Sequence, residues 1–204
     1  MNVAVVDYGL GNIYSVMAAL RAVNATAVLD IDGSMIAKCD TALVPGVAAF
    51  GAGMSNLHKS GQADALREHF ASGKKLVGLC LGAQMFMEGS QETPEVPGLG
   101  FVPGSVVRLD EGKCTVPNQG WLRVSDSHTA EQLTSRATLG GEYFYFSHSY
   151  RMDIRADVST LGLATSGTET IVAIYQFGNV LGIQFHPERS GVRGLQFLSA
   201  VLAS

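Results

Sequence analysis

The sequence predicts an α/β fold: a single three-layer domain whose central, mostly parallel sheet is flanked by helices and extended by antiparallel strands in the second half. In the first half, short apolar runs alternate with segments of helical periodicity, as expected when crossover helices bury both faces of the strands. From Gly98 onward, β-branched and aromatic runs are separated by Gly, Pro, Asn and Ser. The 204 residues contain no repeat or linker-like composition, so we expect one domain over residues 1–204.

The first half is expected to contain four strands and two long helices. One helix is predicted by an apolar stripe that begins at Ile13 and ends at Val23, and another by a periodic segment closed by Gly73, which suits a left-handed helix cap. The predicted strands are residues 3–6, 26–29, 41–44 and 75–79, and the predicted helices are residues 13–23 and 62–71.

The second half is expected to add antiparallel strands and hairpins to the same sheet. Their signal is β-branched and aromatic residues bounded by turn residues. The predicted strands are residues 101–109, 141–146, 170–177 and 180–185, and a last helix over residues 194–202 is expected to pack back on the sheet.

Composition excludes several classes of protein. A net charge of -4 provides no basic field for nucleic acid, so we expect no nucleic-acid partner. Cys39, Cys80 and Cys114 are odd in number and widely spaced, which fits neither a disulfide framework nor a metal site and favours reduced, cytoplasmic thiols. We also expect no signal peptide and no membrane span, because no apolar run is long enough.

The segment around Cys80 predicts a nucleophile. The strand 75–79 runs into Gly-x-Cys-x-Gly at positions 78–82 and then into a helix over roughly residues 83–88. This is the cysteine analogue of the nucleophile elbow, in which a tight strand-to-helix turn projects the reactive side chain above the sheet edge. The helix dipole would favour the reactive thiolate, and the Leu81 amide is placed to donate to an oxyanion. A buried cysteine with a packing role only is the competing interpretation.

A base and an orienting carboxylate are predicted directly after the strand 180–185. His186 and Glu188 are two residues apart, and in extended backbone such residues point to the same side, while Pro187 restricts the geometry between them. A carboxylate on one imidazole nitrogen fixes the tautomer and stabilises the imidazolium that forms when the other nitrogen takes the thiol proton. Taken alone, the segment also fits a histidine that is satisfied by a carboxylate and has no further role.

The other four histidines are weaker candidates. His148 also follows an apolar strand and is the rival base, but the nearest carboxylate in sequence is Asp153, so it ranks second. His58 and His69 are expected to be solvated surface residues, and His128 lies in a segment of loop composition.

Two glycine-containing turns follow predicted strands. The turn at Gly46 offers a second oxyanion donor opposite the elbow, although a simple strand-ending Pro-Gly turn has the same sequence signature. Gly9 and Gly11 form a Gly-x-Gly, but Tyr14 occupies the place of the third glycine of a dinucleotide loop. We therefore predict no nucleotide cofactor.

Assembled, these segments resemble the class I, triad-type glutamine amidotransferases, and within them the glutaminase subunits of imidazole glycerol phosphate synthase. The resemblance runs nearly end to end. The elbow and the His-Pro-Glu ending mark the superfamily, and the other segments narrow it to the subunit. The matching segments are Asp-Tyr-Gly-Leu-Gly-Asn (7–12), Pro-Gly-Val (45–47), Gly-Leu-Cys-Leu-Gly-Ala-Gln (78–84), Pro-x-x-Gly-Trp (117–121), Tyr-Phe-x-Phe-Ser-His-Ser-Tyr (143–150) and Gly-x-Gln-Phe-His-Pro-Glu-Arg-Ser (182–190).

The resemblance implies that L-glutamine forms a γ-glutamyl thioester on Cys80, that His186 protonates the departing ammonia and then activates water, and that Glu188 holds the imidazole. It implies a heterodimer in which ammonia passes to a (β/α)₈-barrel cyclase subunit that makes imidazole glycerol phosphate and aminoimidazole carboxamide ribotide in histidine biosynthesis. It implies no cofactor and no metal. It assigns the oxyanion amides to Val47 and Leu81, substrate contacts to Gly46, Gln84, Ser149 and Tyr150, and interface positions to Asn12, Trp121 and Arg189.

The chain departs from the family pattern in two places. Ala48 stands where the family usually has glycine, which would restrict a peptide flip at Val47. Asn118, Gln119 and Leu122 differ from the usual Pro-His-Met-Gly-Trp-Asn and bear on the interface. Three alternatives stay open: a paralogous glutaminase that feeds another synthase, such as one amidating a surface sugar; a cysteine-dependent hydrolase or peptidase of similar fold; and a non-enzymatic assembly subunit.

Overall fold

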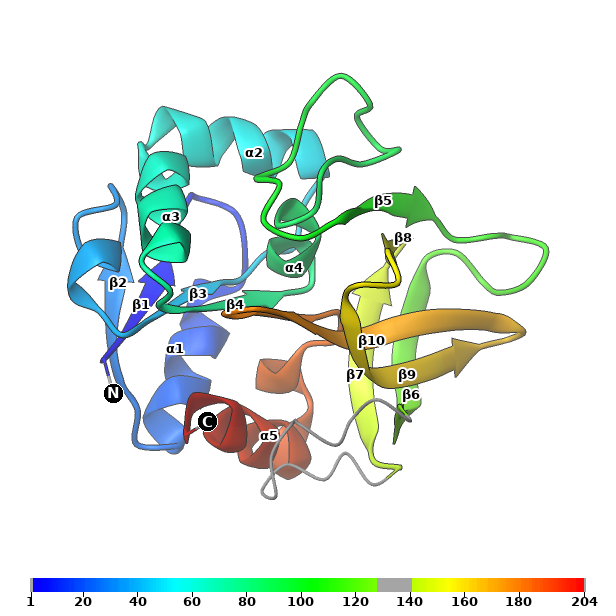
Figure 1. Ribbon diagram of the computed structural model, residues 1–204. Coiled ribbons are helices and arrows are strands. Elements are labelled where there is room, and N and C mark those ends of the chain that lie inside the picture. Colours follow the sequence, from blue (N-terminus) through cyan, green and yellow to red (C-terminus); the bar gives the residue numbers. More distant parts are fainter. Residues whose placement is uncertain (1, 128–140, 204) are drawn as a thin grey trace.

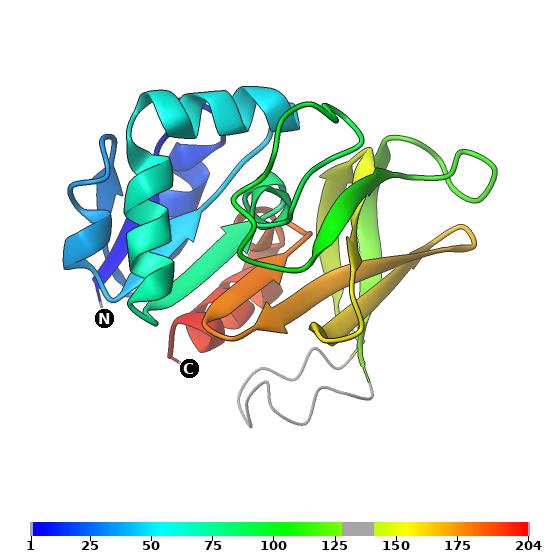
Figure 2. The ribbon, with the colours of Figure 1, turned by 45° about the horizontal axis from the view of Figure 1, so that its top comes forward.

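The computed structural model describes residues 2–127 and 141–203, and at its centre lies a nine-stranded sheet with helices on both faces (Figures 1 and 2). The strand order is β2-β1-β3-β4-β11-β10-β9-β6-β7. The first five strands in this order are parallel, and the pairs from β11–β10 to β6–β7 are antiparallel. The parallel strands are β1 (Asn2–Val6), β2 (Thr26–Asp30), β3 (Thr41–Val44), β4 (Lys75–Leu79) and β11 (Val180–Ile183), and the others are β6 (Asn118–Asp126), β7 (Tyr143–His148), β9 (Ser159–Ser166) and β10 (Glu169–Phe177).

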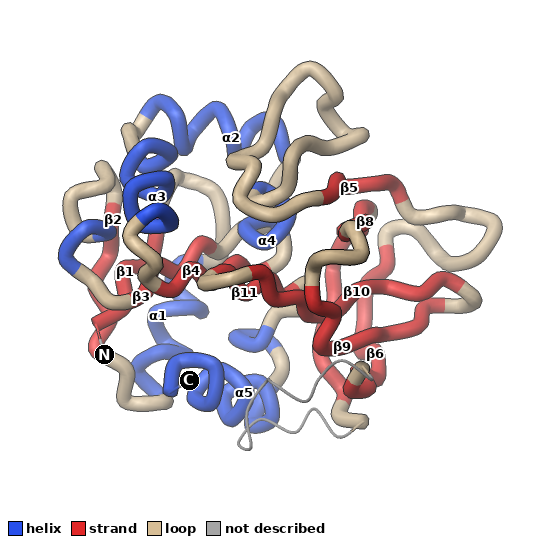
Figure 3. The backbone as a smooth tube through the Cα atoms, viewed as in Figure 1, coloured by secondary structure: helices blue, strands red, loops and turns tan. Residues whose placement is uncertain are grey.

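Helices cover the two faces of the parallel part of the sheet and enclose two apolar cores (Figure 3). One core contains Phe50, Met54 and Leu66 from the helices on one face, and the other contains Leu20 and Phe197 from the opposite face. The first face carries α2 (Phe50–Lys59), α3 (Gln62–Ala71) and α4 (Leu81–Met85), the second carries α1 (Ile13–Ala22) and α5 (Gly191–Ala203), and short 3₁₀ turns are η1 (Ile36–Lys38) and η3 (Pro187–Arg189).

The burial of the strands explains why their sequences differ. All four residues of β3 and of β11 are buried, because helices cover both of their faces. In β7 the buried residues alternate with exposed or half-buried ones, as in a strand with one face on the core. The predicted α/β class, with a mostly parallel centre and an antiparallel extension, is therefore confirmed.

Some helices and strands have their predicted bounds, some differ from the prediction in extent, and some were not predicted. The strands at 41–44 and 75–79 and the helix at 62–71 have the predicted bounds. The helix expected at 83–88 instead begins at Leu81 and ends at Met85, so Cys80 is the residue that directly precedes it. Helix α2 was not predicted, because its two glycines and polar residues hide its apolar stripe.

Two predictions for the second half are wrong in strand pairing. Residues 101–109 do not extend the main sheet: β5 (Gly104–Arg108) pairs with β8 (Tyr150–Ile154) in a separate two-stranded sheet. Strand β11 is not only an antiparallel extension, since it lies parallel to β4 on one side and antiparallel to β10 on the other. Strands β6, β8 and β9 were not predicted. Pairing partners are chosen by long-range packing, which the local pattern does not encode.

His69 is not the solvated surface residue that its polar neighbours suggest. It is 3% exposed, and its two ring nitrogens lie 3.1 Å from the carbonyl oxygens of Ile36 and Lys75. Burial lowers the pKa of its imidazole. His58 is exposed as predicted, and His128 lies outside the described residues.

The glycines that flank Cys80 allow the elbow to form. A Cβ on Gly78 would lie 2.5 Å from the Ala83 nitrogen, and a Cβ on Gly82 would collide with the carbonyl oxygen of Val44 in the neighbouring strand β3. The turn therefore packs backbone against backbone, and any side chain at these two positions would push α4 away from the sheet.

Replacement of Gly82 by alanine is expected to destabilise the fold by about 2 to 3 kcal/mol, the usual cost of forcing an extra carbon into a packed core. Thermal or urea unfolding measures this loss. Gly89→Ala is the matched control, because a Cβ there has no atom within 4 Å. Equal unfolding free energies for the two variants would contradict the packing argument.

Candidate active site

Cys80 occupies the strained turn between β4 and α4. Its backbone has φ 51° and ψ -108°, a region that residues with a Cβ rarely adopt. The conformation is held on both sides, because the Cys80 amide donates to the Ile183 carbonyl (2.7 Å) and the Gln84 amide donates to the Cys80 carbonyl (3.1 Å). The side chain is nearly buried, with the residue 5% exposed, and it lines a cavity.

His186 and Glu188 form a buried pair just beyond β11. The Nδ1 atom of His186 lies 2.9 Å from Oε1 of Glu188, and the two side chains are 2% and 3% exposed. Because a carboxylate only accepts, Nδ1 carries a proton, and Nε2 is the atom left for acid–base chemistry. Among the described residues, Nε2 has no hydrogen-bond partner.

The electrostatic surroundings of His186 favour its charged form. Burial alone lowers the pKa of the imidazole, but the Cys80 sulfur and the Glu188 carboxylate outweigh that effect and raise the pKa to about 10. An imidazolium beside a thiolate is the ion pair that activates a cysteine nucleophile. The register of β11 beside β4, with Ile183 opposite Leu79, brings the two residues to the same sheet edge.

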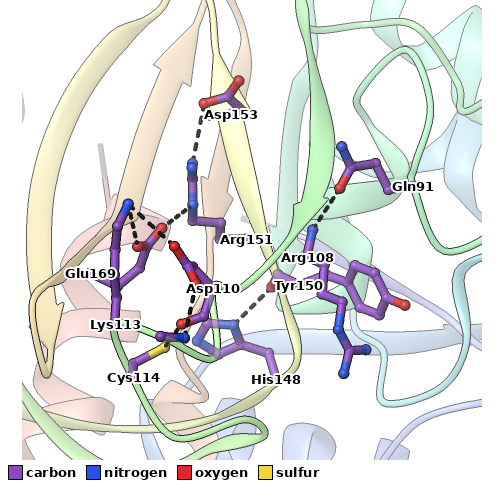
Figure 4. A network of polar contacts seen from close by, with 11 residues as sticks. Gln91, Arg108, Asp110, Lys113, Cys114, His148, Tyr150, Arg151, Asp153 and Glu169 are labelled. Atoms are coloured by element: carbon purple, nitrogen blue, oxygen red, sulfur yellow. Dashed lines mark hydrogen bonds and ion pairs between the residues drawn. The ribbon is translucent and has the colours of Figure 1, made fainter.

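His148, the rival base, is committed to structural contacts. Its Nδ1 lies 2.8 Å from the Tyr150 carbonyl, as Figure 4 shows, and its Nε2 lies 2.9 Å from Nδ2 of Asn118. Burial, helped by the charge of His186, lowers the pKa of His148 to about 4 against the opposing effect of the hydrogen bond to Tyr150. His148 is therefore neutral, with both nitrogens engaged.

A cavity of about 580 Å³ opens over Cys80 and is lined by most of the residues that the sequence singled out. Gly46, which is buried and packs against Leu81, and His186, which is 2% exposed, do not line the cavity. Trp121 lies outside the cavity. The lining residues are Asn12, Val47, Ala48, Cys80, Leu81, Gln84, Glu92, Arg108, Pro117, Ser147, His148, Ser149, Tyr150, Glu188 and Arg189.

The two expected oxyanion donors are not both aimed at the cavity. The Leu81 amide donates to the Gly46 carbonyl at 3.4 Å. In a trans peptide the carbonyl and the following N–H point in opposite directions, so the Val47 N–H points away from Leu81. In this conformation the Leu81 amide is paired with the Gly46 carbonyl, and the Gly46–Val47 peptide must rotate before the Val47 N–H can turn toward Leu81.

Two charged residues of the cavity carried no signal in the sequence. Glu92, in the loop after α4, accepts a hydrogen bond from the Phe50 amide at the start of α2 (2.7 Å). Arg108, at the end of β5, lies over the Tyr150 ring at 5.9 Å from its centroid. An isolated charged residue in a loop or at a strand end has no local pattern that distinguishes it from surface charge.

Two of the three residues assigned to an interface, Trp121 and Arg189, contact the same Tyr145 ring, and the third, Asn12, lines the cavity together with Arg189. Trp121 is 52% exposed and contacts the Tyr145 ring edge-on, with centroids 6.0 Å apart. The Arg189 guanidinium lies over the same Tyr145 ring, 4.5 Å from its centroid. Asn12 caps α1 by accepting from the Ser15 amide (3.3 Å) and lines the cavity mouth.

Within residues 2–127 and 141–203, no group of three His, Cys, Asp or Glu side chains is arranged to hold a metal ion. Likewise, none of the helices in the described part of the chain has the length and apolar character needed to cross a membrane.

Comparison with known proteins gives matches over almost the whole chain. Residues 4–201 match the family model described as glutamine amidotransferase class-I. Imidazole glycerol phosphate synthase subunit HisH of Symbiobacterium thermophilum is 38% identical over 197 residues, which cover 97% of this chain and 91% of the relative. The HisH subunit of Methanothermobacter thermautotrophicus is 38% identical over 199 residues, covering 96% and 95% of the two chains.

Solved structures share the fold. A crystal structure of a glutamine amidotransferase superposes with a TM-score of 0.78 at 21% identity, covering 98% of both chains. The structure of PurLQS from Thermotoga maritima gives a TM-score of 0.76 at 18% identity over 99% of this chain and 97% of that one. On its sequence matches, the chain belongs to the class I glutamine amidotransferase family and, within it, to the HisH subunits of imidazole glycerol phosphate synthase.

Proposed function

We propose that this chain hydrolyses L-glutamine to glutamate and ammonia and delivers the ammonia to a separate (β/α)₈-barrel cyclase subunit, which makes imidazole glycerol phosphate and aminoimidazole carboxamide ribotide in histidine biosynthesis. The observation that carries the proposal is the buried His186–Glu188 pair beside Cys80, whose sulfur helps to raise the pKa of His186 and whose backbone forms a strained elbow. The names of the HisH relatives support the synthase and the existence of a partner subunit.

The first half of the reaction breaks the side-chain amide. The Cys80 thiolate attacks the amide carbon of glutamine, and the oxygen of the tetrahedral intermediate takes the negative charge. His186 Nε2 gives its proton to the nitrogen, the C–N bond breaks, and ammonia leaves a γ-glutamyl thioester on Cys80. Glu188 on Nδ1 holds the ring in place throughout.

The second half returns the enzyme to its starting state. The neutral His186 Nε2 takes a proton from water as the water oxygen attacks the thioester carbon. The C–S bond breaks, glutamate is released, and Cys80 is again a thiolate beside an imidazolium. The amide of Leu81 and, after rotation of the Gly46–Val47 peptide, that of Val47 stabilise both tetrahedral intermediates.

The charges of the cavity suit the zwitterionic end of glutamine. Among the lining residues, Glu92 and Glu188 are the carboxylates, and Glu188 is committed to His186. We assign Glu92 to the α-ammonium group and the Arg108 guanidinium, which also pairs with the exposed Glu111 (2.6 Å), to the α-carboxylate, because each supplies the complementary charge. Gln84 and the backbone at Ser149 and Tyr150 would seat the rest of the substrate from the opposite wall.

The surface formed by Trp121, Tyr145 and Arg189, with Asn12 at the cavity mouth, is the proposed docking face for the cyclase. Exposed aromatic and arginine side chains are common anchors of interfaces. A partner docked there would cover the cavity and keep ammonia from protonation in bulk water. The HisH assignment and the thiols together favour a cytoplasmic heterodimer without a nucleic-acid or membrane partner.

Cys80→Ala is expected to lower glutamine-dependent product formation by about 10⁶-fold, to background, because the nucleophile is removed. Synthesis from added ammonium salt by the complex should persist, since that route bypasses the thioester. The assay measures glutamate release and cyclase product with and without the barrel subunit and its ligand. Cys114→Ala, a half-buried thiol outside the cavity, is the control.

Other outcomes of this assay identify the alternatives. Retained glutamine turnover in Cys80→Ala would remove the proposed nucleophile. Activation by a different synthase, with none by the barrel cyclase, would favour a paralogue with another ammonia acceptor. Turnover of peptides or esters in place of glutamine would indicate a different hydrolase, and a wild-type chain that supports assembly without any turnover would indicate a non-enzymatic subunit.

Glu188→Gln is expected to lower turnover by about 10⁴-fold, less than loss of the nucleophile, because the imidazole loses its orienting charge but stays in place. The pH profile carries a second signature. Glu188 helps to raise the pKa of His186, and the acid form of His186 is lost as pH rises through that pKa. Removing the carboxylate should therefore move the basic limb of kcat to lower pH. The exposed Glu68→Gln variant is the control, and an unmoved basic limb would contradict the pairing.

Ala48→Gly is expected to accelerate glutamine hydrolysis by the isolated chain about fivefold, if the added backbone freedom favours the rotated peptide by about 1 kcal/mol. Ala48 directly follows the Gly46–Val47 peptide, whose carbonyl accepts from the Leu81 amide. Ala49→Gly, the same change one residue further on, should have little effect on the steady-state rate. Equal effects of the two variants would mean that Ala48 does not control the rotation.

A further inference from the structure

The main-chain carbonyl of Tyr150 fixes the orientation of two buried side chains. It accepts a hydrogen bond from His148 Nδ1 (2.8 Å) and another from Gln84 Nε2 (3.0 Å). A carbonyl oxygen has no proton to give, so His148 must carry its proton on Nδ1 and Gln84 must turn its NH₂ group toward Tyr150. Figure 4 shows the His148 side chain directed at this carbonyl.

The orientation of Gln84 determines that of Gln184. The NH₂ group of Gln84 also lies 3.1 Å from Oε1 of Gln184, which can only accept. The NH₂ group of Gln184 must then point the other way, and it lies 3.6 Å from the Cys80 sulfur. Gln184 is fully buried, so water does not compete for this contact.

The far end of the chain of hydrogen bonds is anchored as well. The unprotonated Nε2 of His148 accepts from Asn118 Nδ2 (2.9 Å), and Asn118 Oδ1 accepts from the Ser166 hydroxyl (3.0 Å). Every donor and acceptor in the series Ser166, Asn118, His148, Tyr150, Gln84 and Gln184 is consistent with a neutral His148. The series therefore delivers one N–H, that of Gln184, to the reacting sulfur.

We propose that Gln184 is a further catalytic residue, whose side-chain N–H donates to the Cys80 sulfur and stabilises the thiolate. Gln184 and His186 are two residues apart on the segment after β11, so both reach the elbow from the same direction. His186 supplies the proton transfer, and Gln184 supplies a neutral donor that remains in place when His186 has given up its proton. The inference rests on the proposed role of Cys80 as nucleophile.

The test is the pH dependence of Cys80 alkylation by iodoacetamide, followed at that residue by mass spectrometry. Gln184→Met keeps the side-chain length without a donor, and Gln184→Glu puts a carboxylate beside the sulfur. Both should shift half-maximal alkylation to higher pH, Gln184→Glu the more, and lower kcat for glutamine about 10- to 100-fold, the range expected for one lost hydrogen bond to a charged group. Gln176→Glu, the same charge change on β10 outside the cavity, should leave the alkylation profile unchanged.

A measurement on the folded wild-type chain covers the case in which the Gln184 variants do not fold. The side-chain amide resonances of Gln184 in ¹⁵N-labelled protein should move when Cys80 is alkylated, because the proton loses its acceptor. Unmoved resonances, or a normal alkylation profile in folded Gln184→Met, would overturn the proposal. Alkylation requires no glutamine, so a shifted profile in a chain that does not hydrolyse glutamine would refute the proposed function and leave the Gln184 contact standing.

Discussion

The positive φ of Cys80 is the constraint on which the rest of the site depends. A residue with a Cβ reaches φ 51° only at a cost in free energy, and here the surroundings hold it there: Ile183 accepts from its amide and Gly82 lets α4 start against β3. The turn places the sulfur at the cavity and sets the amide of Leu81, which donates to the Gly46 carbonyl, next to it.

Strand β11 is the second element that creates the site, because it joins two kinds of sheet. Its parallel pairing with β4 puts its carboxyl end next to Cys80, and its antiparallel pairing with β10 attaches the extension formed by β9, β6 and β7. The residues just after β11 are therefore forced to the sheet edge where the elbow lies. Gln184 and His186 lie two residues apart just after the strand, and the 3₁₀ turn η3 then brings Glu188 back against His186, so one short segment brings an amide, an imidazole and a carboxylate to the same place.

Burial sets the charge of the two histidines near the cavity in opposite ways. His148 is removed from water without a carboxylate and is neutral, whereas His186 is removed from water beside Glu188 and Cys80 and is charged. The same antiparallel extension that anchors His148 through Asn118 carries Trp121 on its outer surface, three residues along β6. A partner on that surface would thus contact the strand whose inner residue Asn118 holds His148 in place.

The sequence by itself determined the class of fold, the nucleophile candidate and its partners, because each rests on a local pattern: a buried strand with glycines at 78 and 82 for Cys80, and His-Pro-Glu directly after a strand for His186 and Glu188. The expected extended backbone between these last two was wrong, since they meet through the 3₁₀ turn Pro187–Arg189. Only the tertiary structure decided what depends on contacts between distant segments. It placed β11 parallel to β4, moved β5 and β8 into a separate sheet, buried His69, and brought Glu92, Arg108 and Gln184 to the cavity or the sulfur. It also decided that the Gly46 carbonyl, and not the Val47 amide, faces Leu81, because the rotation of one peptide is set by its packed neighbours and leaves no trace in the order of residues.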